Sequence, residues 1–234
     1  MAQSQRAPRG RPEVLLLCGG SVLAAAAFEF VGSDAFRFLL GEYSPALVAI
    51  AVSVVGVLSL EASARRGWLH YAAPGRPRLR MLVGLGAALT VPVIVVDWLG
   101  GFPPGINVRW PSALLLYPVV AVMAELVFHA CPVGIAAVSW PKGSPAADRV
   151  GLFVALAVAA LIEPSFQVLW VLGQSPPWAN AYVGFHLLVF NIVALQVFRL
   201  RGFLAAYLFR LSYYVVWHIL WGHARLGLLF GGET

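Results

Sequence analysis

Two ionisable residues, Glu125 and His129, stand four positions apart in the apolar segment AELVFHACPV, which runs from residue 124 to residue 133. At this spacing both side chains lie on the same face of a helix. A carboxylate beside an imidazole can accept and return protons, which is the basis of general acid–base chemistry. The segment therefore predicts a cluster of ionisable groups inside an apolar helix.

Four more ionisable residues fall deep in the apolar segments that follow: Glu163, His186, Arg210 and His218. An ionisable side chain at the centre of a bilayer costs roughly 2.5–3.5 kcal/mol even on the insertion scale, so each needs a partner. A guanidinium does not lose its proton, so Arg210 requires an acidic neighbour. A helical rise of about 1.5 Å per residue puts Arg210 level with Glu125. We therefore predict an ion pair between them, with His129 as a third member.

The same count places Glu163 and His218 in a second layer nearer the outer end of the spans, with His186 in the same half of the bilayer. Gln167 lies one turn beyond Glu163 on the same face, where it could orient the carboxylate or a water molecule. Pro164 disfavours helical geometry at Glu163 and predicts a local break in the helix. This layer could hold an acid/base pair of Glu163 and His218, assisted by His186 or Gln167.

Structural interpretations of these residues stand beside the functional one. A histidine in a membrane helix can be a hydrogen-bonded packing residue, and Glu125 with Arg210 can be an interhelical brace. Tyr214, a candidate binding residue with Arg210 and Gln167, belongs to an aromatic group that can serve packing and anchoring. Three further acidic residues near the ends of apolar segments are expected to reach the interface: Glu29, Glu61 and Asp97.

A cofactor site is a further alternative, although none is required. His186 and His218 fall at similar depths on neighbouring spans, which suits axial ligation of a haem or two ligands of a metal site. The chain has no Cys-x-x-Cys-His sequence, so a haem would be held without covalent attachment. A non-enzymatic scaffold or a transport-related protein is the third class, in which the buried charges fix the helix packing or line a solute path.

Membrane-spanning helices must position these residues. The 234-residue chain is 60% hydrophobic and 11% charged, and its mean hydropathy is +0.82, values outside those of soluble domains. Apolar runs of about 18–22 residues cross a hydrocarbon core roughly 30 Å thick. The sequence predicts an all-α polytopic bundle, one domain over residues 1–234, with seven spans near residues 14–32, 44–62, 81–100, 111–133, 150–172, 180–198 and 202–222.

The basic residues predict the orientation of these spans, because short cytoplasmic loops carry the excess of Lys and Arg. The N-terminal segment and the second, fourth and sixth loops contain Arg6, Arg9, Arg11, Arg65, Arg66, Arg76, Arg78, Arg80, Lys142, Arg149, Arg199 and Arg201. The other loops hold Arg37 and Arg109. We therefore expect a cytoplasmic N-terminus, and the net charge of +6 matches anionic lipid headgroups rather than nucleic acid.

The first span also has features of a cleaved signal, namely the preceding arginines and the small residues at 23–27. The apolar run continues to Val31, which favours a retained span. The preference for Arg over Lys and the richness in Ala, Gly and Leu are typical of a bacterium with a GC-rich genome. The expected location is therefore the inner membrane of a bacterial cell.

Two segments resemble motifs of a known family. AELVFH is similar to the first motif, Glu-Glu-x-x-x-Arg, of the CPBP family, which contains CAAX prenyl protease type II and bacteriocin-processing membrane proteins. The run GFLAAYLFRLSYYVVWH at 202–218 resembles the approach to the third motif, His-x-x-x-Asn or Asp. The resemblance covers residues 111–222. It implies a glutamic-type intramembrane endopeptidase, a hydrolase that cleaves a membrane-associated peptide or protein, in which a glutamate activates water and histidines assist.

Within this resemblance, Glu125 matches the second glutamate of the first motif and His218 matches the histidine of the third. Ala124 stands where the family has its first, water-activating glutamate, and His129 replaces the arginine. Gly222 stands at the final Asn or Asp. Either the working carboxylate has moved elsewhere, or the chain keeps the fold without the protease chemistry.

The second motif, Phe-x-x-x-His, has two partial matches. By spacing, Glu163 falls near its histidine, and Tyr182 to His186 on the next span gives an aromatic-x-x-x-His sequence. A relocated carboxylate would therefore be Glu163. The resemblance predicts a polar cavity built by the last four spans, and it implies no particular substrate.

Overall fold

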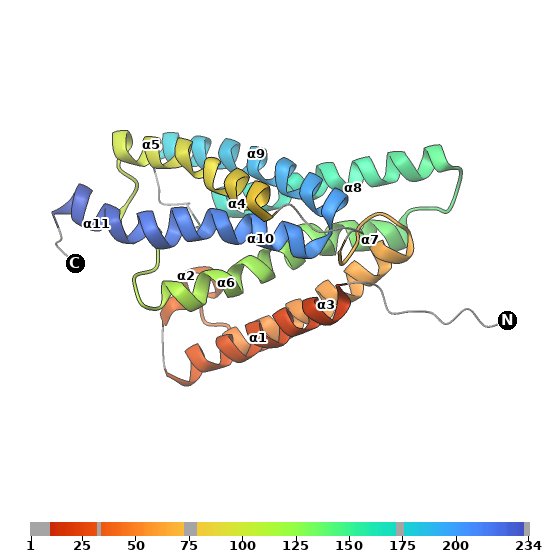
Figure 1. The fold of residues 1–234 in the computed structure, drawn as a ribbon, viewed down its shortest axis with the longest axis horizontal. Coiled ribbons are helices and arrows are strands. Elements are labelled where there is room, and N and C mark those ends of the chain that lie inside the picture. Colours follow the sequence, from red (N-terminus) through yellow and green to blue (C-terminus); the bar gives the residue numbers. More distant parts are fainter. Residues whose placement is uncertain (1–9, 32–33, 73–78, 172–175, 232–234) are drawn as a thin grey trace.

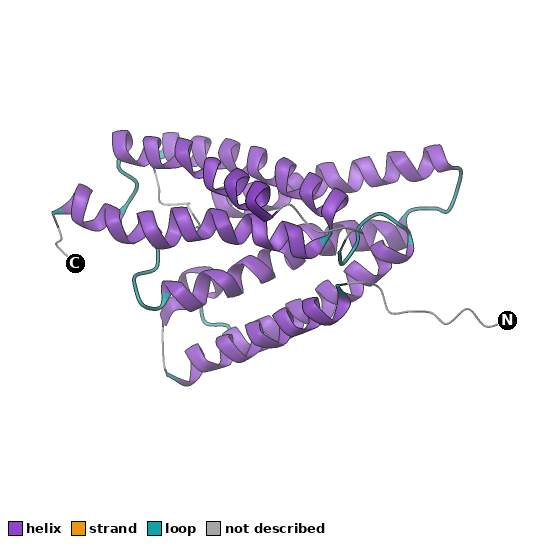
Figure 2. Ribbon diagram, in the orientation of Figure 1, coloured by secondary structure: helices purple, strands orange, loops and turns teal. Residues whose placement is uncertain are grey.

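The computed structural model describes residues 10–31, 34–72, 79–171 and 176–231, and this part of the chain contains helices and loops but no strand (Figure 2). Most helices lie along the length of the bundle (Figure 1). The elements are α1 (Arg11–Phe30), η1 (Asp34–Phe36), α2 (Arg37–Leu40), α3 (Pro45–Arg65), α4 (Leu79–Ala88), α5 (Thr90–Gly100), η2 (Pro104–Ile106), α6 (Ala113–Ala124), η3 (Glu125–Ala130), α7 (Cys131–Ser139), α8 (Pro145–Phe166), η4 (Gln167–Val171), α9 (Pro177–Arg201), α10 (Phe203–Tyr214), η5 (Val215–Trp221) and α11 (Gly222–Phe230).

Seven helical stretches in the described residues are long and apolar enough to cross a membrane. They are α1, α3, α4 with α5, α6 through α7, α8 with the first residues of η4, α9, and α10 through α11. Large apolar side chains point outward along them, for example Leu16, Leu99 and Phe153, each more than 70% exposed. Such side chains are covered by lipid rather than water in a membrane protein. The prediction of an all-α, multi-pass bundle is confirmed.

The sequence predicted that the fourth span ends at residue 133, just after Pro132, but the structure shows a longer helix. The helix continues through α7 to Ser139. The π-helical segment η3 precedes the proline, and at its end the Cys131 N–H donates to the carbonyl of Leu126, five residues back. This wider turn shifts the hydrogen-bond register just before Pro132, so the missing N–H of the proline does not stop the helix.

The predicted break at Glu163 was also wrong in position. Helix α8 passes through Pro164 and ends at Phe166, and the irregular segment is the π-helical η4, which begins at Gln167. The Gln167 N–H still donates to the carbonyl of Glu163. The backbone at Glu163 is therefore helical, and the distortion lies one turn nearer the outer end.

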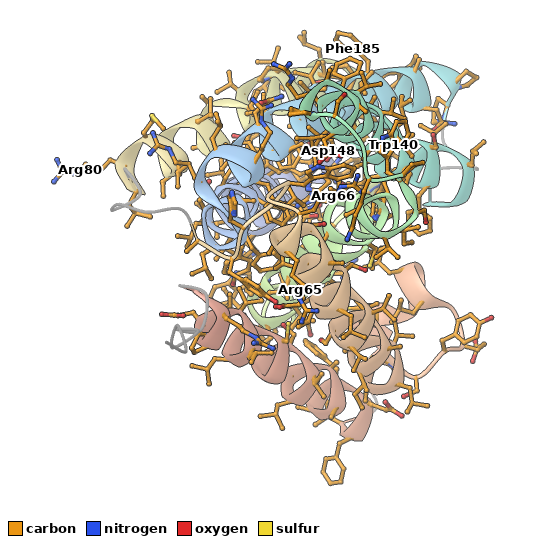
Figure 3. All side chains as sticks on the ribbon, turned by 90° about the vertical axis from the view of Figure 1, so that its right-hand side faces the viewer. Arg65, Arg66, Arg80, Trp140, Asp148 and Phe185 are labelled. Carbon is orange, nitrogen blue, oxygen red and sulfur yellow. The ribbon has the colours of Figure 1, made fainter. Side chains whose placement is uncertain are left out.

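Figure 3 views the bundle from the end that carries the loops after α3, α7 and α9, and we call this the basic end. Arg66 after α3 donates through Nη1 to the carbonyls of Ala137 (2.8 Å) and Trp140 (2.7 Å), and through Nη2 to Asp148 (2.7 Å). These bonds join the end of α3 to α7, to the loop after it and to the first turns of α8. The described basic residues of these loops lie at this end, as predicted. The part of the chain that is not described includes Arg6, Arg9, Arg76, Arg78 and the side chain of Arg37.

The loop after α3 also holds the start of α10. The Phe203 N–H donates to the carbonyl of His70 (2.9 Å) and that of Leu204 to the carbonyl of Tyr71 (3.3 Å). The Tyr71 hydroxyl donates to Glu61 (3.0 Å), and burial together with this carboxylate raises the pKa of Tyr71 well above its ordinary value. Tyr71 therefore stays protonated, and the link to α3 persists at alkaline pH.

Close packing of α3 on α7 depends on Gly134. A Cβ at this position would lie 2.4 Å from the Cβ of Ser59 and 2.5 Å from its Cα. We expect Gly134→Ala to lower the free energy of unfolding by about 1–3 kcal/mol, because the two backbones must separate. Gly84→Ala is the control, since no atom lies within 4 Å of a Cβ there. Thermal unfolding in detergent micelles gives the midpoint of each variant. Equal midpoints for Gly134→Ala and Gly84→Ala would contradict the close contact between α3 and α7.

The sequence predicted that Asp97 would reach the membrane interface, and this prediction was wrong. Asp97 is fully buried, and Arg225 of α11 donates to it through Nε (2.6 Å) and Nη2 (2.7 Å). Trp221 Nε1 and the N–H of Phe102 donate to the same carboxylate. We call these four residues the outer clamp. The arginine that pairs with Asp97 lies on the last helix, so the sequence around Asp97 does not reveal the ion pair. Glu29 is exposed, as expected, and accepts from Ser44.

Candidate functional site

Arg210 of α10 joins two glutamates from different helices. Its Nε donates to Oε1 of Glu125 (2.6 Å), and its Nη1 and Nη2 donate to Oε1 (2.8 Å) and Oε2 (3.0 Å) of Glu163. All three side chains are at most 2% exposed. The predicted pair of Glu125 and Arg210 is confirmed. The two-pronged bond to Glu163, which ties α8 into the same group, was not predicted.

His129 completes this group, which we call the buried charge cluster: Glu125, His129, Glu163 and Arg210. Its Nδ1 lies 2.8 Å from Oε2 of Glu125, so the two side chains share a face as predicted, even though η3 has π-helical geometry. The Nε2 of His129 has no partner among the described residues. Two carboxylates and one imidazole therefore face a single guanidinium.

The prediction of two separate layers was wrong for Glu163. It hydrogen-bonds to Arg210 and forms no hydrogen bond with His218 among the described residues. Helix α8 begins at Pro145 and extends beyond the neighbouring helices at the basic end (Figure 1). A depth counted from the start of its apolar run therefore places Glu163 too far toward the outer end.

Two further side chains bind the guanidinium. Nη1 of Arg210 donates to the hydroxyl of Tyr214 (3.3 Å), and Nη2 donates to Oδ1 of Asn191 (3.4 Å). The guanidinium also lies over the ring of Phe190, 5.0 Å from its centroid. Tyr214 was a predicted binding residue. Asn191 was not among the predicted site residues. An amide in the middle of an apolar helix was the available signal.

Two cavities meet at the buried charge cluster. The polar cavity has a volume of about 110 Å³, enough for several water molecules, and its polar lining is Tyr117, Glu163, Gln167, Tyr182, His186, Arg210, Tyr213, Tyr214, Trp217 and His218. The lateral groove has a volume of about 540 Å³ and a mainly apolar lining from α2, α3, α6, η3 and α8. Glu163, Gln167 and Tyr214 line both. They are therefore the polar end of an apolar groove.

The two histidines of the polar cavity are held by neutral partners. His186 Nε2 lies 3.0 Å from the hydroxyl of Tyr213, and its ring stacks on Tyr182. His218 Nδ1 lies 2.5 Å from Oδ1 of Asn107, and its ring stacks on Tyr117 at 4.4 Å between centroids. The proposed acid/base pair of Glu163 and His218 is not in contact in this arrangement, although both residues face the same cavity.

A metal or haem at His186 and His218 finds little support in the geometry. The described residues contain no group of three or more His, Cys, Asp or Glu side chains placed to hold a metal ion. Each histidine has one ring nitrogen engaged by Tyr213 or Asn107. The polar cavity of about 110 Å³ is smaller than the roughly 300–1,000 Å³ of pockets for larger organic ligands.

Comparison with known proteins supplies no relative for this arrangement. No family model matches the chain, and no match was found among curated proteins or solved structures. The resemblance to CPBP proteins consequently rests on the residues of its short motifs.

Proposed function

We propose that this chain is a multi-pass protein of a bacterial inner membrane, with its basic end in the cytoplasm, that binds a membrane-associated peptide without cleaving it. One observation carries the proposal. All four carboxylate oxygens of Glu125 and Glu163 are hydrogen-bonded to Arg210 or His129. A carboxylate that activates water must accept a proton, and its charge-assisted hydrogen bonds to the guanidinium make it a weaker base.

Ala124 supports the same proposal. Where the CPBP motif has its water-activating glutamate, this residue adds a methyl group to the wall of the lateral groove. Arg210, which holds both glutamates, lies on the run that approaches His218, the residue that matches the histidine of the third motif. The protein would then be a CPBP-like peptide-binding protein in which the ion pairs of the buried charge cluster replace the catalytic groups of the protease.

The lateral groove suits a peptide as ligand. Its volume of about 540 Å³ is in the range of ligand pockets, which are mostly apolar with a few placed polar groups. Apolar side chains of a peptide would lie against Met123, Val127 and Phe128, while Gln167 and Tyr214 offer an amide and a hydroxyl to its backbone. Backbone polar groups inside a bilayer need such partners. The groove therefore provides both kinds of contact that a membrane-embedded peptide requires.

A glutamic endopeptidase is the second candidate, and one observation favours it. Glu163 and Gln167 line the polar cavity as well as the groove, so a water in the cavity would lie near a carboxylate and an amide. Peptide hydrolysis would then require Arg210 to release one oxygen of Glu163. His218 or His186 would stabilise the developing charge.

A cleavage assay separates the two candidates. Wild type, Glu163→Gln, Glu125→Gln and His218→Ala are reconstituted in vesicles with a fluorescent single-span Leu/Ala peptide. We expect all four proteins to leave the peptide intact, because the ion pairs with Arg210 make Glu125 and Glu163 weaker bases. Cleavage by wild type that Glu163→Gln abolishes would overturn the binding proposal and establish the endopeptidase.

Binding is measured in the same vesicles by energy transfer to the peptide. Val127→Trp places a large ring in the lateral groove and is expected to weaken binding by roughly tenfold or more. Leu85→Trp, at a position 37% exposed on α4 and away from the groove, is the matched control. Equal binding by the two variants would contradict the assignment of the groove.

A further inference from the structure

We propose that a groove between α8 and α9 at the basic end binds one anionic phospholipid. The groove has a volume of about 580 Å³, and its walls include Leu152 and Leu156 of α8 and Leu188 and Ile192 of α9. Arg149 and Arg199 line its end. It shares no lining residue with the polar cavity or the lateral groove, so this inference does not depend on the proposed function.

The two arginines reach the same end because their helices are antiparallel. Arg149 lies in the second turn of α8, and Arg199 lies in the last turn of α9. Both are exposed, and neither makes a hydrogen bond or an ion pair with another described residue. Arg65, Arg66, Arg210 and Arg225, by contrast, each have an acidic partner. Arg149 and Arg199 therefore present uncompensated positive charge beside an apolar groove.

This combination fits a phospholipid better than a free anion. The groove runs along α8 from Arg149 to Leu161, about 18 Å at a rise of about 1.5 Å per residue, a length suited to an acyl chain. The guanidinium groups form two-pronged hydrogen bonds with phosphate oxygens at its charged end. Gln196 lies beside Arg199 in the lining and adds an amide. A headgroup with net negative charge is favoured, since a quaternary amine would be repelled by the two arginines.

Lipid binding to the purified, delipidated full chain tests the proposal. Native mass spectrometry from detergent micelles counts bound phosphatidylglycerol and phosphatidylcholine. Because each basic residue near an anionic lipid contributes about 1 kcal/mol, Arg149→Gln with Arg199→Gln should weaken phosphatidylglycerol binding about 30-fold. Arg80→Gln with Arg201→Gln is the control: it removes the same charge at the same end, from exposed residues that do not line the groove.

A second variant tests the apolar part of the site. Ala157→Phe fills the groove and leaves both arginines in place, and it should also reduce binding of phosphatidylglycerol. Inorganic phosphate should not displace the lipid. The proposal is overturned if both double variants lose binding equally, if phosphatidylcholine binds as well as phosphatidylglycerol, or if inorganic phosphate competes. A dimer that dissociates in the Arg149/Arg199 variant would assign the groove to a second copy and overturn it as well.

Discussion

Replacing Arg210 by Met is expected to lower the free energy of unfolding by about 3–5 kcal/mol, because it breaks a buried ion-pair network by removing its cation. The substitution leaves Glu125 and Glu163 buried without their cation. Arg210→Lys should recover only part of this loss, because one ammonium cannot reproduce the three charge-assisted bonds of the guanidinium. Unfolding in mixed micelles, followed by circular dichroism, measures each variant.

Two companion variants show whether the loss comes from the unpaired carboxylates. Arg210→Met combined with Glu125→Gln and Glu163→Gln removes all three charges and should regain most of the stability. Arg201→Met removes an exposed arginine at the basic end and should change the free energy of unfolding by less than about 0.5 kcal/mol. If the triple variant is no more stable than Arg210→Met alone, the cluster does not act as an ion-pair brace.

The parts of the fold that the sequence predicts are those governed by local composition. Hydropathy along each segment reveals the seven spans, because a lipid-facing helix must be apolar whatever its neighbours are. The pair of Glu125 and Arg210 was predictable for a related reason. A charge in the bilayer needs a partner at its own depth, and Glu125 and Arg210 do meet, although the fourth span runs on to Ser139 and extends further past Glu125 than the count assumed.

The errors have a common physical origin, which is how one helix is placed relative to another. Glu163 joins Arg210 because α8 extends past its neighbours, a property of packing that the residues of α8 do not reveal. Asp97 is buried because Arg225, 128 positions away in the chain, folds over it. The π-helical turns at η3 and η4 arise where prolines and polar residues interrupt an otherwise regular helix. Period and hydropathy along one segment do not show them.

One connection between the outer clamp and the polar cavity is the loop that follows α5. Asp97 accepts from the N–H of Phe102, and Arg225 donates to the carbonyls of Phe102 (2.5 Å) and Pro103 (3.1 Å). Five residues after Phe102, Asn107 in the same loop holds His218. A substitution in the clamp should therefore alter the position of His218 in the polar cavity.

Arg225→Met is accordingly expected to destabilise the protein by about 3–5 kcal/mol, since it leaves Asp97 buried without its cation, and to speed hydrogen exchange across residues 102–107. Asn107→Ala breaks only the second link, so it should loosen His218 while Phe102 stays protected. Arg109→Met, an exposed arginine of the same loop, should leave both stability and exchange unchanged. Mass spectrometry measures the hydrogen exchange of residues 102–107 in each variant. If exchange is equally slow in Arg225→Met and Arg109→Met, the loop is held independently of the clamp.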